Sequence, residues 1–389
     1  MFQLNLSNPR LLLSDWLSQN GLKIECDGRF TDSNGSLRTS KSILDRIVLD
    51  VNAIPRSPGT GAPSRPLIES AINEAIEKAR LDAEITLQTK LAFVRSIRDR
   101  FDELALLLVK DSKDARFVAH ILRHWFWTVK RKLFNKSVFD HLFLVFLGAQ
   151  GAGKSTAIKQ FIRPLEGFII NVTGKTIMDD RQHLALARNF IGFFEELSGL
   201  PKAEIEALKN IITADQISVR LFHTQNVENH PQKTSFIGSS NKTLVQVVQD
   251  STGMRRFVEI HVADRIDRNA INTFDMLELW KCVDESNESG YLPPIREELE
   301  IHQKSLTTDD SITYFIDDFE YVPALKRETF KTSKFLYEEY INCCHQNGFS
   351  NPFSHTTFSK ILKSRGFKPE RQRGERGFLI GKFQKERLS

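Results

Sequence analysis

The pattern of hydrophobic and polar residues changes near residue 141. Before it, apolar side chains recur at the spacing of one helix face over residues 67–79, over about 85–109 and again over 117–132. Such spacing predicts amphipathic helices. After it, short apolar runs alternate with helical stretches: LFLVFL, FIGFFEE, KTSFIGSS and RRFVEIHV. Buried strands separated by helices predict an α/β core with a parallel sheet.

The two ends of the chain have different patterns. The first 52 residues contain Asp27-Gly28 and Asn34-Gly35, pairs typical of tight turns in a small strand-containing unit. Residues 54–66 are rich in proline and glycine, as expected of a linker. From residue 329 the pattern predicts a helix over 334–344, a turn, a helix over 354–364 and a hairpin. This order resembles that of winged-helix domains.

These patterns divide the chain into five parts. We expect a small N-terminal α+β segment with its linker over 1–66, a helical region suited to oligomerisation over 67–140, and the α/β core over 141–264. A helical, acidic connector over 265–325 and a winged-helix-like domain over 326–389 follow. The length of 389 residues fits this division, because domains average about 150 residues.

Composition excludes several classes of protein. Hydrophobic content of 40% and charged content of 26% are ordinary for a globular chain. The four cysteines show no CxxC spacing, so neither a disulfide framework nor a zinc module is indicated. The N-terminus lacks the pattern of a signal peptide, and the longest apolar runs are too short to span a bilayer. We therefore expect a cytoplasmic protein with no membrane partner.

The positive charge is concentrated at one end. Residues 326–389 contain 14 Lys and Arg against 6 Asp and Glu, a net charge of +8. Because the whole chain has a net charge of +5, the other 325 residues sum to −3. Localised basicity predicts a polyanion partner for the C-terminal domain. A second basic cluster, at 130–132, follows three aromatic residues, and here a packed core with a solvated helix end is favoured over nucleic-acid binding.

The strongest motif is the run Gly148 to Ser155, which matches G-x-x-x-x-G-K-[ST] between a predicted strand and a predicted helix. Glycines let consecutive backbone N–H groups cradle phosphate oxygens, and the helix N-terminus adds partial positive charge. The motif predicts a site for ATP and Mg²⁺, with Lys154 on the β- and γ-phosphates and Ser155 on the metal. The expected nucleotide-binding residues are Gly148, Ala149, Gln150, Gly151, Ala152, Gly153, Lys154, Ser155 and Thr156.

Three further motifs follow in order. Glu195 and Glu196 end the second apolar run, where Glu195 is expected to join Ser155 as a ligand of magnesium; a charged pair can also simply end a strand in solvent. Asn241 ends the third run and suits the attacking water or the γ-phosphate. Arg255 and Arg256 precede the fourth run, and an arginine there could stabilise the transferring phosphate. Together with the glycine-rich motif, this order favours an ATPase over a passive nucleotide binder.

The motifs GAQGAGKST, FFEEL with KAEIEALKNIITAD, FIGSSN and STGMRRFVEI together resemble the virulence-associated E (VirE/VapE) family of phages and genomic islands. That family is related to superfamily 3 helicases of the AAA+ class. The resemblance covers residues 117–262. It implies Walker A, Walker B, sensor 1 and arginine-finger roles, in that order, for Lys154 with Ser155, Glu195 with Glu196, Asn241, and Arg255 or Arg256.

The resemblance also implies partners. Such enzymes form rings, usually hexamers, in which the finger of one subunit completes the site of its neighbour, and a hairpin before sensor 1 grips single-stranded DNA. Phe222 and His223 occupy that hairpin here, although Phe222 could also be a core residue. Replication of a phage or satellite element in a bacterial host, beside a primase or other replication proteins, is the implied setting.

The C-terminal domain offers a second DNA contact. Arg371, Arg373 and Arg376 lie on the predicted hairpin and Lys360 on the second helix, positions suited to phosphates. A basic surface for protein contacts is the alternative. We therefore expect a ring-forming, ATP-dependent DNA helicase or replication initiator. An ATP-regulated DNA-binding initiator without unwinding remains open, and a small-molecule P-loop kinase is disfavoured because no lid for a second substrate is evident.

Overall fold

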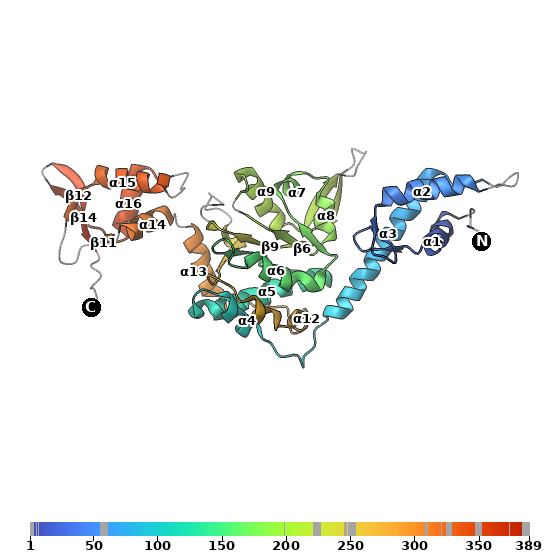
Figure 1. Cartoon of the computed structure of the whole chain (residues 1–389). Helices are drawn as coiled ribbons and strands as arrows, with labels where there is room; N and C mark the ends of the chain where they lie inside the picture. The colour runs from blue at the N-terminus through green and yellow to red at the C-terminus, as the bar shows by residue number, and fades with distance from the viewer. Residues whose placement is uncertain are drawn as a thin grey trace.

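The protein forms three parts in a row (Figure 1). The computed structural model describes residues 4, 6, 8–54, 61–197, 199–220, 227–244, 247, 254–307, 310–319, 321–323, 329–346, 352–372 and 374–382. An N-terminal unit and a C-terminal unit lie at opposite ends, and a larger α/β core lies between them. The long helix α3 (Arg65–Leu91) joins the N-terminal unit to the core, and α13 (Arg296–Thr307) lies between the core and the C-terminal unit.

The core contains a five-stranded sheet of the described residues, and every pairing in it is parallel. Its spatial order is β10 (Phe257–His261), β4 (Phe143–Leu147), β9 (Ser235–Ser240), β6 (Ile191–Phe194) and β5 (Ile169–Asn171). The predicted α/β class and parallel sheet are confirmed. The four predicted runs are strands, and β5, which has only three residues, is an edge strand that the sequence pattern did not single out.

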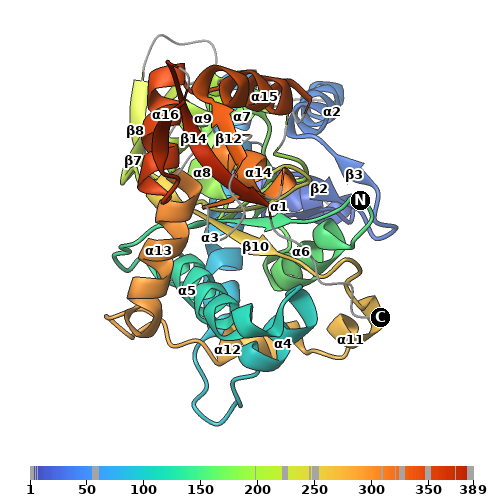
Figure 2. The ribbon, with the colours of Figure 1, turned by 90° about the vertical axis from the view of Figure 1, so that its left-hand side faces the viewer.

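Helices cover both faces of this sheet (Figure 2). Alternate residues of β4 point to opposite sides: Leu144 and Phe146 pack with one cluster, Phe143 and Val145 with the other. The first cluster includes α4 (Phe101–Leu108), α5 (Ala115–Leu133), α6 (Lys154–Ile162) and α12 (Met276–Lys281). The second includes α7 (Gly174–Met178), α8 (His183–Arg188) and α9 (Lys202–Ile212). Because both faces are covered, the central strands β4 and β6 contain no polar side chain.

Helix α5 is buried without interruption from Ile121 to its end at Leu133. Trp125, Phe126 and Trp127 are fully buried, which confirms the packed-core interpretation. The prediction of a solvated basic end is wrong, because residues 130–132 are buried too. The Lys130 ammonium donates to the carbonyls of Trp280 and Val283, and three basic side chains at this helix end all find backbone carbonyls far along the chain.

The predicted helix over residues 85–109 is interrupted. Helix α3 ends at Leu91, residues 92–100 are not helical, and α4 begins at Phe101. Tertiary partners replace helical hydrogen bonds in the gap: the Val94 N–H donates to the Lys281 carbonyl over 2.9 Å. The Asp99 carboxylate then accepts the Phe101 N–H over 2.9 Å and starts the next helix.

The N-terminal unit contains α1 (Pro9–Gln19), the short strands β1 (Lys23–Ile24), β2 (Phe30–Thr31) and β3 (Leu37–Arg38), and α2 (Ser40–Ala53). The turns at Gly28 and Gly35 have positive φ, and the three strands are antiparallel, as the DG and NG pairs predict. Its core also includes Ile68 and Ile72 of α3. Packing therefore continues past residue 66, where the sequence had indicated a boundary.

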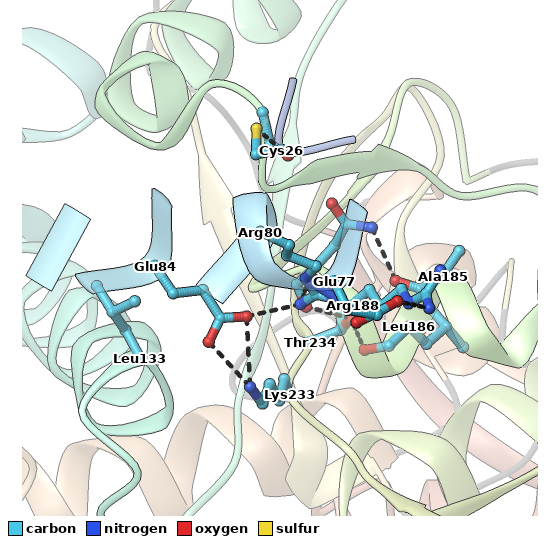
Figure 3. Close-up of polar contacts among 12 residues, drawn as sticks. Cys26, Glu77, Arg80, Glu84, Leu133, Ala185, Leu186, Arg188, Lys233 and Thr234 are labelled. Carbon is cyan, nitrogen blue, oxygen red and sulfur yellow. Dashed lines mark hydrogen bonds and ion pairs between the residues drawn. The ribbon is translucent and has the colours of Figure 1, made fainter. Parts of the chain in front are cut away.

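The remainder of α3 packs Leu87 and Leu91 into the core and also binds it through polar contacts (Figure 3). Arg80 and Glu84 are buried, 2.7 Å apart. The Arg80 guanidinium also donates to the Arg188 carbonyl over 2.5 Å, and Glu84 pairs with Lys233 at 3.2 Å. Arg188 precedes β6 and Lys233 precedes β9, so α3 holds the amino ends of two sheet strands.

The C-terminal unit begins earlier than residue 326. Ile312 and Phe315 of α14 (Asp310–Asp318) and Tyr321 of β11 (Tyr321–Pro323) belong to its core, because they are buried against α15 (Ser333–Gln346) and α16 (His355–Ser364). Its sheet also contains β12 (Thr329–Thr332) and the antiparallel hairpin of β13 (Pro369–Gln372) and β14 (Glu375–Lys382). The helices and hairpin predicted from residue 329 onward are thus present, with an added helix before them.

Candidate functional site

A cavity of about 450 Å³ lies at the edge of the sheet where β4, β6 and β9 end. Parallel strands bring their carboxyl ends to one edge, so the segments that follow these strands meet there. The cavity brings together most of the residues predicted to bind or hydrolyse the nucleotide. Its lining consists of Gln150, Gly151, Gly153, Lys154, Ser155, Thr156, Glu195, Glu196, Ser239, Asn241 and Arg268.

The glycine-rich loop (residues 148–153) connects β4 directly to α6. Gly151 and Gly153 have φ angles of 84° and 98°, a backbone region that side chains disfavour. Helix α6 begins at Lys154, so the unpaired N–H groups of its first turn lie beside the cavity. This local geometry is that of an anion-binding helix terminus, and it arises because glycine stands where the chain must turn.

Lys154 is folded back onto the loop. Its ammonium donates to the carbonyls of Gly148 and Ala149 over 2.7 and 2.9 Å. Burial lowers the pKa of Lys154, while the negative charge of Glu196 opposes that shift. The ammonium is thus positioned at the loop in a partly desolvated setting, where its attraction for an anion is stronger than in water.

Ser155 contacts a residue that the motifs did not identify. Its hydroxyl lies 3.2 Å from the hydroxyl of Ser239 on β9, and Ser239 in turn donates to the Glu195 carbonyl over 2.5 Å. One buried hydroxyl therefore connects the start of α6 to the end of β6. No sequence signal singled out Ser239, because a serine inside an apolar strand has no characteristic spacing from the glycine-rich loop.

The two acids behind β6 differ in their surroundings. The Glu195 carboxylate pairs with Lys159 on α6 at 2.6 Å, and both side chains are more than half exposed. Glu196 is close enough to influence the pKa of Lys154. Both acids therefore lie at the carboxyl ends of the strands, beside the glycine-rich loop. Asn241, the first residue after β9, is exposed at the same cavity.

Arg255 and Arg256 lie at the amino end of β10, whereas the cavity lies at the carboxyl ends of the strands. They precede β10, whose register with β4 pairs Phe257 with Phe143 and His261 with Leu147. The glycine-rich loop begins only after Leu147, so a strand length of roughly 16 Å separates the arginines from it. Burial and the neighbouring Arg255 lower the pKa of Arg256. The structure does not bring either arginine to the cavity of its own chain.

The predicted DNA-binding residues are only partly described. Phe222 and His223 follow β7 (Gln216–Arg220) and precede β8 (Val227–Pro231), which form an antiparallel hairpin, but both lie outside the described residues. Arg373 also lies outside them. Lys360 on α16 and Arg371 and Arg376 on the β13–β14 hairpin are exposed. Arg371 and Arg376 are directly opposite each other across the two strands.

Two structural features are absent from the described residues. No group of three or more His, Cys, Asp or Glu side chains in that part of the chain is arranged to hold a metal ion. None of the helices described there is long and apolar enough to cross a membrane. The oxygen donors at the cavity include the Ser155 hydroxyl and the carboxylates of Glu195 and Glu196, which are ligands that suit magnesium.

Comparison with known proteins gives one family match. The model of the family described as virulence-associated protein E-like domain matches residues 95–308, more than half of the chain. This range includes the whole parallel sheet and the cavity at its edge. No protein with a curated description matches.

Solved structures of similar arrangement have low sequence identity. The apo C-terminal region of NrS-1, in its A form, is 14% identical, with a TM-score of 0.44, and the match covers 96% of this chain and 99% of that one. The JCV helicase is 14% identical, with a TM-score of 0.27 and coverage of 77% and 79%. The SCCmec type IV Cch, described as an active helicase, is 12% identical, with a TM-score of 0.29 and coverage of 86% and 70%.

Proposed function

Because the chain belongs to the family of virulence-associated protein E-like domains, we propose that it is a magnesium-dependent ATPase that acts on DNA. The observation that carries the proposal is the single cavity in which Lys154 and Ser155 face Glu196 and Asn241. A cation, a hydroxyl, a carboxylate and an amide at the end of a parallel sheet are the groups that phosphoryl transfer requires. The fold is then a P-loop core of the superfamily 3 AAA+ type.

The roles of these residues follow from their positions. Lys154 exchanges the loop carbonyls for the β- and γ-phosphate oxygens of ATP, and the N–H groups of Gly151 and of residues 153–156, which line the cavity, surround the phosphates. Ser155 and Glu195 hold magnesium, which supplies charge neutralisation at the phosphates. Glu196 orients the attacking water and Asn241 holds it from the neighbouring strand. Ser239 positions the Ser155 hydroxyl.

We further propose that the site is completed by a second copy of the chain. Arg255 and Arg256 are too far from the glycine-rich loop of their own chain to reach its phosphates, since the length of β10 intervenes. A neighbouring subunit could present them instead. This supports a ring, with six subunits as the expected number.

DNA is the proposed substrate of the ring. The exposed arginines of the β13–β14 hairpin and Lys360 would bind duplex phosphates, as the wing and helix of a winged-helix-like domain. Single-stranded DNA would pass the β7–β8 hairpin that carries Phe222 and His223. The proposed role is unwinding or translocation during replication of a phage or mobile element in the bacterial cytoplasm, with a primase as a further partner.

Two assays on the same preparation test the proposal. ATP hydrolysis is measured with and without single-stranded DNA, and strand displacement is measured on forked DNA. Wild type is compared with Lys154→Ala and with Lys175→Ala, an exposed lysine in the second GKT sequence, which lacks the first glycine of the motif. Hydrolysis that survives Lys154→Ala would refute the assigned site. Hydrolysis without strand displacement would favour the initiator that does not unwind.

A further inference from the structure

The segment after β10 lies against the glycine-rich loop. The Ile266 N–H donates to the Ala152 carbonyl over 2.9 Å. A methyl group added at Gly153 would lie 3.5 Å from Cβ of Ile266 and 3.9 Å from Nε of Arg268. Arg268 is the first residue of α11 (Arg268–Asn272). Its position beside the loop is therefore set by backbone contacts of the segment that carries it.

Arg268 carries a charge that nothing in the described chain neutralises. The residue is exposed and takes part in no hydrogen bond or ion pair with another described residue. The acid next to it, Asp267, accepts the N–H groups of Asn269 and Ala270 over 2.9 and 3.2 Å and so serves as the cap of α11. A guanidinium without a counter-ion on the wall of a cavity is available for an anionic ligand.

Three adjoining hollows meet at Arg268. The first is the 450 Å³ cavity with Lys154 and Ser155. The second, of about 670 Å³, is lined by residues 265–269 together with Gly151 and Ala152. The third is a narrow cleft in which Arg268 faces Thr156 and Gln160 of α6. A ligand that extends from the phosphate cavity toward either neighbour must pass this side chain.

We propose that Arg268 binds the phosphate groups of the nucleoside triphosphate held by its own chain. This inference rests on the proposed function and adds to it a second cation within the subunit, distinct from Arg255 and Arg256 at the far edge of the sheet. The planar guanidinium can form two parallel N–H···O bonds to phosphate, whereas Lys154 acts as a point charge. Each site would then contain Lys154 and Arg268 from one chain.

Equilibrium binding of a fluorescent ATP analogue tests the contact. Arg268→Ala should weaken binding by about 10- to 100-fold, the range expected for a hydrogen bond between charged groups. Arg268→Lys should recover part of the loss. Arg265→Ala is the matched control, because this exposed arginine three residues earlier lines the second hollow but not the phosphate cavity. Its affinity should equal that of wild type.

A mixing experiment tests whether the contact lies within the subunit. Arg268→Ala chains are mixed with Lys154→Ala chains, and ATP hydrolysis is measured. If Arg268 serves its own site, every site in the mixture lacks one of the two cations and the activity stays at the level of the separate variants. Recovered hydrolysis would place Arg268 at the site of a neighbour and overturn the proposal.

Different results would refute the proposed function and the role of Arg268. Should wild type and Arg265→Ala bind no ATP analogue, the proposed function itself is wrong. Should they bind it and Arg268→Ala bind it equally well, only the role of Arg268 is refuted. Unfolding of Arg268→Ala, followed by tryptophan fluorescence, should match wild type because the exposed side chain makes no hydrogen bond or ion pair with another described residue. A binding loss that persists with unchanged unfolding supports the proposal.

Discussion

The hydroxyl of Ser239 joins Ser155, at the start of α6, to the backbone of Glu195, at the end of β6. It lies 3.2 Å from the Ser155 hydroxyl and is buried to 2% exposure. Two segments of the cavity that are 40 residues apart in the sequence thus share one hydrogen-bonding group. We regard Ser239 as a positioning residue, because it reaches the proposed magnesium ligand but need not touch the substrate.

Replacing Ser239 with alanine should therefore affect magnesium dependence more than folding. The Ser155 hydroxyl loses the group that orients it. The Glu195 carbonyl loses its donor, and a buried unsatisfied acceptor lowers the free energy of unfolding by about 1–3 kcal/mol. We expect the magnesium concentration needed for half-maximal hydrolysis to rise several-fold. Ser235→Ala is the control on the same strand, because the buried Ser235 hydroxyl has no hydrogen-bond partner among the described residues. If both variants behave alike, the bridging role is wrong.

Arginines 255 and 256 should act across a subunit interface. Arg255→Ala or Arg256→Ala alone should abolish most hydrolysis, since loss of an arginine finger typically costs about 10³-fold. Mixing either variant with Glu196→Gln chains should restore activity, because some interfaces then combine an intact finger with an intact acid. Steady-state hydrolysis across a series of mixing ratios measures this. Activity that never exceeds the sum of the separate variants would argue against a finger supplied by the neighbour.

The sequence predicted the parts of the site that depend on strand order. Lys154, Glu196 and Asn241 follow three buried strands, and parallel pairing necessarily brings such residues to one edge. Ser239 and Arg268 could not be predicted in this way. One lies inside a strand, and the other reaches the loop through a backbone bond between Ile266 and Ala152, a contact that no local spacing records.

The predictions of the fold that the structure contradicts failed for the same reason. Lys130 follows an aromatic run at a helix end, where basic residues are commonly solvated. Its partners are instead two carbonyls and the Glu285 carboxylate, all 150 or more residues away. The helix expected over 85–109 is broken because Val94 bonds Lys281. Local patterns report helix faces and strand runs, but tertiary hydrogen bonds decide where an element ends and whether a charge is buried.

Arg371 and Arg376 form a like-charged pair across the β13–β14 hairpin. Such a pair destabilises a hairpin, so its presence on an exposed surface favours an anionic partner. Changing both to glutamine should weaken duplex DNA binding and reduce the slope of log K against log salt by about 1.8, or 0.9 per phosphate contact. Fluorescence anisotropy over a salt series measures both quantities.

Hairpin stability supplies an independent readout for the same variant. Removing the repulsion should leave the C-terminal unit unchanged or stabilise it by up to about 1 kcal/mol. Arg98→Gln is the control. This side chain is 79% exposed and lies outside the C-terminal unit, so the variant should leave the salt dependence of DNA binding unaltered. An unchanged slope in the double variant would remove the hairpin from the DNA interface.

The contact between Arg80 and Glu84 should stabilise the attachment of α3 to the core. In Arg80→Met, the buried Glu84 carboxylate keeps Lys233 as its one ion-pair partner among the described residues, and the Arg188 carbonyl loses its donor. We expect a loss of about 3 kcal/mol in the free energy of unfolding. The exposed pair of Arg10 and Glu74 in the N-terminal unit is the control: Arg10→Met should cost under about 1 kcal/mol. Equal effects in urea unfolding would contradict a buried clamp.

His124 should make the protein sensitive to acid. The imidazole is fully buried, with Nε2 3.0 Å from the Asp140 carbonyl and Nδ1 accepting the Tyr291 N–H over 3.4 Å, so the neutral ring fits its surroundings. Burial lowers its pKa to about 4 from the ordinary 6.5. Between these values the unfolded chain binds a proton that the folded chain excludes. Stability is therefore fully present above pH 6.5 and is lost as pH falls toward 4.

The size of this effect follows from the shift. A difference of this magnitude corresponds to about 3 kcal/mol, and His124→Gln, whose amide can keep a donor toward Asp140, should flatten the fall in unfolding free energy by that amount. Urea unfolding at intervals from pH 7 to pH 4.5 measures it. His141, whose pKa burial also lowers to about 4, should sustain a residual slope in the variant. His345→Gln, at the exposed end of α15, is the control, and its unfolding free energy should change with pH as that of wild type does. A slope for His124→Gln equal to that of wild type would show that protonation of His124 does not destabilise the folded state.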